Sequence, residues 1–171
     1  MDLHLFLVMV HVAGTILGVG GATLAEVFYV LALKDKKVDA SEKLLMHANY
    51  KVIRVGLALA VISGIALVWW WVSQGNPWPL ESPKMWVKDI MVVVIIINAV
   101  MISRRWVPMW LGAALSFTSW WGATILGLWR MIPYSFVEIV IGYVVAVFVV
   151  AAILEGIKKF YWRRRASEMN M

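Results

Sequence analysis

The sequence contains no cysteine. Disulfides, iron–sulfur clusters, thiolate metal sites and cysteine nucleophiles are therefore excluded, whichever compartment the loops face. Charged residues are also scarce, at 15% of the chain, whereas hydrophobic residues make up 63%. This composition is too apolar for an ordinary soluble domain. The sequence therefore predicts an integral membrane protein whose first partner is the lipid bilayer.

Five apolar stretches are long enough to cross a bilayer as helices. They predict an all-α fold, a single membrane domain over residues 1–171 built as a five-transmembrane-helix bundle. The expected helices cover about 3–33, 42–73, 84–103, 108–131 and 135–160. The third is the shortest, because its uncharged run covers only 90–103. No positive residue precedes the first stretch, so we interpret it as a permanent helix and not as a signal peptide.

The sixteen basic residues predict the orientation. In a five-span arrangement only Lys84, Lys88 and Arg130 fall on one side, and the other thirteen fall on the opposite side. Basic loops face the cytoplasm, so we expect a multi-pass cell-membrane protein with its N-terminus outside and its C-terminus in the cytoplasm. The net charge of +6 is then membrane-surface charge. No nucleic-acid partner is expected.

Helix starts are marked by ordinary capping signals. Asp39 with Glu42, and Ser135 with Glu138, have the spacing of a capping box. Pro83 and Pro108 are predicted to lie in the first turns of the third and fourth helices, where proline is favoured. The segment 73–83 between the second and third helices is expected to be an ordered turn.

Two histidines share one face of the first helix. His4 and His11 are seven residues apart, which is about 10 Å along the axis. A small-residue series ending in an acid continues the same face: Gly14, Gly18, Ala22 and Glu26. Small residues at this spacing let another helix approach closely, so His11 is predicted to point into a helix contact. It is either hydrogen-bonded to a neighbouring helix or a metal or haem ligand.

A second group of polar side chains is predicted near the outer surface, above His11. Its members are His4, Lys88, Asp89, Arg130 and Glu138. Together they would form a layer that holds an anionic group or relays protons. Taken singly, Glu138 has its capping role, Lys88 and Arg130 can extend to the surface, and Asp89 can pair with either base.

The cytoplasmic half has its own polar set. Glu26 is expected to pair with Lys51 or Arg54, near His47. A haem shared by His11 and His47 meets a depth problem, because the two histidines belong to opposite halves of the membrane. Asn98 and the group Trp120, Trp121 and Thr124 are expected to make hydrogen bonds between helices.

Three stretches suggest a family: HVAGTILGVGGATLAEVFYVLALKD (11–35), YKVIRVGLALAVISGIALVWW (50–70) and MWVKDIMVVVIIINAVMISRR (85–105). Together they resemble the copper-resistance-D and membrane-type protoporphyrinogen oxidase group of small membrane proteins, and SFTSWWGATILGLWRMIPYS resembles uncharacterised bacterial members. The resemblance implies a bundle of four or five spans. His11 would match the first-helix histidine that binds haem, and Lys88 a lysine on a later helix. The stretch from Gly18 to Glu26 replaces the tryptophan and arginine–phenylalanine pattern expected after that histidine, and Asn98 stands where a further histidine is expected.

Three functions stay open on this basis. The first is binding of a b-type haem or porphyrin in a redox role, with His11 as ligand and Lys88 and Arg130 neutralising the propionates. The second is a permease for a small solute or metal. The third is a non-catalytic subunit or scaffold, joined to a copy of itself or to a membrane partner. No catalytic motif decides whether the protein is an enzyme.

Overall fold

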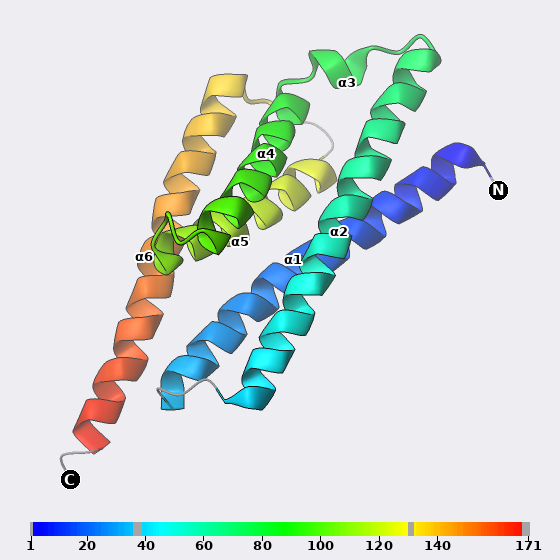
Figure 1. Cartoon of the computed structure of the whole chain (residues 1–171). Coiled ribbons are helices and arrows are strands. Elements are labelled where there is room, and N and C mark those ends of the chain that lie inside the picture. Colours follow the sequence, from blue (N-terminus) through cyan, green and yellow to red (C-terminus); the bar gives the residue numbers. More distant parts are fainter. Residues whose placement is uncertain (1, 36–38, 130–131, 169–171) are drawn as a thin grey trace.

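The computed structural model describes residues 2–35, 39–129 and 132–168, and within these ranges it contains helices and no strand. The helices are α1 (Leu3–Asp35), α2 (Ala40–Ser73), α3 (Trp78–Glu81), α4 (Pro83–Ser103), α5 (Met109–Leu128) and α6 (Phe136–Glu168). Five of them, all except α3, are long and apolar enough to cross a membrane. The predicted all-α five-span bundle is thereby confirmed. Figure 1 shows α1 and α2 crossing as one pair, beside a group formed by α4, α5 and α6.

Most helix bounds agree with the prediction to within two residues, and the larger differences lie at α3, at the end of α5 and at the end of α6. The loop between α2 and α4 contains the one-turn helix α3, which begins with a proline in its first turn. Helix α5 ends at Leu128, and α6 runs on to Glu168, past the predicted end at residue 160. Because α6 holds 33 residues and a bilayer core needs about 20, its last turns lie outside any membrane that the bundle crosses.

Both predicted capping boxes form, and Pro83 opens α4 as expected, whereas Pro108 is the N-cap of α5 and does not lie in its first turn. The side chain of Asp39 accepts the backbone N–H of Glu42 at 2.7 Å, and the Glu42 carboxylate accepts the N–H of Asp39 at 3.0 Å. Glu138 accepts both the N–H and the hydroxyl of Ser135, at 2.7 and 2.8 Å. Each pair satisfies N–H groups that have no partner inside the helix.

Glycines bring the backbones of α1 and α2 into direct contact. A Cβ added at Gly14 would lie 2.6 Å from the nitrogen of Ala60 and 2.9 Å from the oxygen of Gly56. One added at Gly56 would lie 2.7 Å from the nitrogen of Gly18. At Gly14 and Gly56 no side chain has room between the two helices. The small-residue series of the first helix is therefore a packing seam, as predicted.

Helix α5 joins the α1–α2 pair to the rest of the bundle. Its Trp120 is buried against Ala22 of α1 and Ile95 of α4, and its ring fills the space that a side chain at Gly18 would need. A second cluster, formed by Val87, Met91 and Leu126, holds α4, α5 and α6 together. The end of the bundle that carries α3 and the starts of α4 and α6 is named the α3 end below (Figure 1).

Candidate functional site

His11 lies half-buried where α1 crosses α2. Its Nδ1 is 2.9 Å from the carbonyl oxygen of Ala60 and 3.2 Å from the hydroxyl of Ser63. A carbonyl oxygen can only accept a hydrogen bond, so Nδ1 carries the ring proton. The hydroxyl of Ser63 donates to the carbonyl of Leu59 and is free to accept from the ring. In the neutral imidazole this arrangement leaves the lone pair on Nε2.

The predicted helix contact of His11 is confirmed by these bonds. A Cβ added at Gly64, one turn along α2 from Ala60, would lie 3.2 Å from Cε1 of the imidazole. The missing side chain at Gly64 is what admits the ring. The ring therefore has a fixed position and a fixed tautomer.

Lys88 is brought to His11 from a different helix. It lies half-buried in the second turn of α4, about 7 Å along the axis from the first residue of that helix. Its positive charge acts electrostatically on the imidazole of His11. Among the described residues no hydrogen bond or ion pair reaches the Lys88 ammonium.

The neighbours of Lys88 on α4 differ in what they can contribute. Lys84 precedes it by one turn on the same face, and the two positive charges interact. Asp89 follows it directly and also interacts with it electrostatically. The Asp89 side chain, however, is exposed and stands on the next face of the helix, and in the described chain it forms no ion pair. The site is thus more positive than the predicted layer.

The other predicted members of the layer lie elsewhere or have structural partners. His4 stacks on Trp70, with ring centroids 4.3 Å apart, and meets the edge of Trp71 at 5.6 Å. Glu138 is exposed and caps α6 through Ser135. Arg130 lies outside the described residues. Of the predicted layer, only Lys88 remains beside His11, and Lys84 is added to it. His4 lies in an aromatic cluster at the same end.

The polar set at the opposite end is spread over the surface. His47 and Lys51 are exposed, and the guanidinium of Arg54 lies over the ring of Tyr50, 4.4 Å from its centroid. The pairing of Glu26 with Lys51 or Arg54 stays a prediction. His11 contacts α2 at Ala60, thirteen residues and about 20 Å from His47 along that helix. One haem cannot join the two histidines. Among the described residues no group of three or more potential ligands could hold a metal ion.

The expected interhelical hydrogen bonds are present in part. The Asn98 amide donates to the carbonyl of Gly112 at 2.7 Å, and the Trp121 indole donates to the hydroxyl of Thr23 at 3.1 Å. The Thr124 hydroxyl instead donates within its own helix, to Trp120. These bonds join α4 to α5 and α5 to α1. Asn98 and Trp121 thus have a structural role in helix packing.

A cavity at the α3 end was not predicted. It measures about 680 Å³, and Lys84 lines it together with tryptophans from α2 and α3. The sequence places these residues in separate elements, and only the packing of the loops brings them together. In the sequence, tryptophans and prolines gather just before Lys84, and this clustering was the one feature from which a cavity could have been predicted.

Comparisons with known proteins give no relative. No family model, no curated protein and no solved structure matches the chain. Function must therefore be argued from the site itself.

Proposed function

We propose that this integral membrane protein binds an anionic ligand at its α3 end, between Lys88 and His11. The observation that carries the proposal is the half-buried ammonium of Lys88, to which the described residues offer no hydrogen bond or ion pair. A charged side chain within a membrane span is costly and is usually paired. An anion beside Lys88 would supply the missing partner.

Two further features favour an anion over a cation at this place. Lys84, one turn from Lys88, adds a second positive charge, and the two lysines repel one another unless a negative group lies near them. His11 offers Nε2 for a second contact. As a neutral ring it accepts from an O–H of the ligand, and as an imidazolium it donates to an oxyanion. The distribution of basic residues supports placing this end outside the cell.

Benzoate is a suitable probe, because it carries one carboxylate on a small apolar body. Radiolabelled benzoate is measured by equilibrium dialysis against the protein in nanodiscs, with empty nanodiscs as background. Hydrogen bonds to charged groups contribute about 1.5–3 kcal/mol, so Lys88→Met should weaken binding about ten- to hundredfold. Lys88→Arg keeps the charge and should retain most of the affinity.

The matched control is Lys51→Met, which removes an exposed lysine at the opposite end. It changes the net charge equally and should leave benzoate binding unchanged. Equal binding by the Lys88→Met and Lys51→Met variants would exclude a specific anion site at Lys88.

A b-type haem is the second candidate, and the orientation of His11 favours it. Histidines that bind metals generally donate their other ring N–H to a carbonyl or carboxylate, as His11 does to Ala60. The resemblance to the copper-resistance-D group points to the same histidine. Lys88 would then face a propionate, and the haem would supply redox chemistry.

The visible spectrum tests this candidate. Protein purified from haem-replete cells should show a Soret band that His11→Ala abolishes or shifts. The absence of the band, or a band unchanged by His11→Ala, would reject His11 as a haem ligand. Either result leaves the benzoate experiment unaffected.

A further inference from the structure

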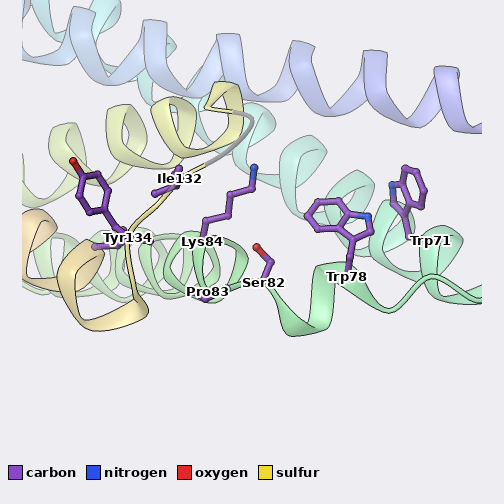
Figure 2. A pocket seen from close by; sticks show the side chains of 8 residues that line it. Trp71, Trp78, Ser82, Pro83, Lys84, Ile132 and Tyr134 are labelled. Atoms are coloured by element: carbon purple, nitrogen blue, oxygen red, sulfur yellow. The ribbon is translucent and has the colours of Figure 1, made fainter.

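The cavity at the α3 end has the composition of a ligand site. Figure 2 shows Trp71 of α2 and Trp78 of α3 on one side and Tyr134 on the other, with Lys84 between them. Ser82, Pro83, Ile132 and Ile139 complete the lining. Its volume of about 680 Å³ lies in the usual range for small-molecule pockets, which are mainly apolar with a few polar groups.

The cavity has a positive side. Lys84 is half-buried, and its ammonium donates to the carbonyl oxygen of Trp129 at 3.0 Å. This bond holds the ammonium near the end of α5. In Figure 2 the Lys84 side chain extends from the start of α4 toward the end of α5. An anionic group in the cavity can therefore reach a fixed positive charge.

A second hollow continues the first along α6. It measures about 370 Å³ and shares Ile132, Tyr134 and Ile139 with the cavity. Beyond these shared residues it is lined by Leu126, Trp129, Glu138 and Gly142. Its walls are mainly apolar, and the one carboxylate among them, Glu138, disfavours a second negative group. The cavity at Lys84 is therefore the positive part of the combined site, and the second hollow is its apolar part.

We propose that the two hollows together bind an amphiphile with one anionic headgroup and an apolar chain, of the fatty-acid class. The headgroup lies at Lys84, between the tryptophans, and the chain runs past Ile132 and Ile139 to Gly142. Tryptophans at this end suit the membrane interface, from which such an amphiphile enters sideways. The proposal rests on the proposed anion site, because Lys84 and Lys88 share one positive face.

Oleate and oleyl alcohol form the matched probe pair, since they differ only in the charged group. Binding of each radiolabelled probe is measured in nanodiscs by equilibrium dialysis. Oleate should bind at least tenfold more tightly than oleyl alcohol. Lys84→Met should remove that difference, and Trp78→Ala should weaken both probes several-fold. Trp69→Ala, which removes a tryptophan exposed at the same end of α2 and outside the cavity, should change neither.

Gly142→Leu tests the path of the chain. No atom lies within 4 Å of a Cβ at Gly142, so the larger side chain fits without disturbing the fold and fills the second hollow. It should weaken oleate binding at least fivefold and leave benzoate binding unchanged. Oleate binding that is indifferent to Gly142→Leu, or equal to that of oleyl alcohol, would overturn the amphiphile site.

The two proposals fail in different ways. If Lys88→Met loses benzoate binding and the natural chain shows no charge-selective oleate binding, the anion site at Lys88 stands and the amphiphile site is rejected. Charge-selective oleate binding with benzoate binding indifferent to Lys88→Met would reject the anion site at Lys88 and keep the amphiphile at Lys84.

Discussion

Glycines allow close helix contact in both the α1–α2 pair and the α4–α5 pair, but different atoms approach them in the two pairs. In α1–α2, glycines place backbone against backbone, at Gly14 and Gly56. In α4–α5, the glycines admit side chains: a Cβ at Gly122 would meet the end of Met91, at 2.9 Å. A backbone cannot move away from an added methyl group, whereas the end of a methionine can. The first pair is therefore a fixed frame, and the second is adaptable.

This difference has a consequence for the site. His11 belongs to the fixed frame, since both its own helix and its hydrogen-bond partners on α2 are held by the glycine seam. Lys84 and Lys88 belong to α4 of the adaptable pair, and the cavity lining lies mainly on α4, α6 and the neighbouring loops. A ligand can thus be accommodated by movement on one side against a rigid wall on the other.

The largest expected effect comes from adding one methyl group to the fixed frame. Gly14→Ala places a Cβ 2.6 Å from the backbone of α2, and overpacking of this kind costs about 1–3 kcal/mol or more. Gly122→Ala should cost much less, because Met91 can rotate away. The free energy of unfolding is measured by SDS titration in mixed micelles.

Gly142→Ala serves as the control for helix propensity. It meets no neighbouring atom and should stabilise the protein by up to about 1 kcal/mol. Equal destabilisation by Gly14→Ala and Gly122→Ala would show that the two pairs do not differ in rigidity.

Much of this frame could be predicted from sequence. Apolar runs gave the five spans, and local spacing gave both capping boxes and the small-residue face of the first helix. The spacing within one helix does not reveal which helix will cover its face. Gly56 as the partner of Gly14, and Trp120 as the side chain filling the space at Gly18, therefore required the structure.

The site was predictable to a smaller extent. Lys88 was expected near His11, and its positive charge acts electrostatically on the imidazole. Asp89 was grouped with them, although consecutive residues on a helix point about 100° apart and cannot both face one site. The cavity is lined jointly by residues 78–84 and by residues 132–139, which are far apart in the sequence. Contacts between two loops leave no periodic pattern in the sequence.

A smaller effect is expected from a feature that the two pairs share. Asn49 donates to the carbonyl of Gly21 at 2.9 Å, and Asn98 donates to that of Gly112 at 2.7 Å. Such bonds between membrane helices contribute about 0.6 kcal/mol on average and up to about 1.7. Asn49→Leu and Asn98→Leu should each destabilise by amounts in this range, measured by the same SDS titration.

Thr124→Val is the matched control for the asparagine variants. It removes a hydroxyl that bonds only to its own helix, at Trp120, and should change the unfolding free energy by less than about 0.5 kcal/mol. A much larger loss for Asn98→Leu than for Asn49→Leu would show that the adaptable pair depends on its polar bond and the glycine seam does not.

The smallest effect on stability is expected at the start of α2, in the loop that joins α1 to α2. The Glu42 N–H, and after it the Ser41 hydroxyl, hold the pKa of Asp39 below its usual value. A lowered pKa means that the cap stabilises α2 above the pH at which an unfolded aspartate titrates, about 3.9, and is lost as the pH falls through the folded value. Hydrogen exchange at the Glu42 and Lys43 amides, corrected for intrinsic rates, should therefore lose protection on acidification from pH 6 to pH 3. Asp39→Asn keeps the acceptor at this position and leaves only the Glu42 carboxylate of the cap to titrate, so its protection should respond much less to the same change. If the natural chain and Asp39→Asn responded alike, the start of α2 would be held by its packing on α1 and not by its cap.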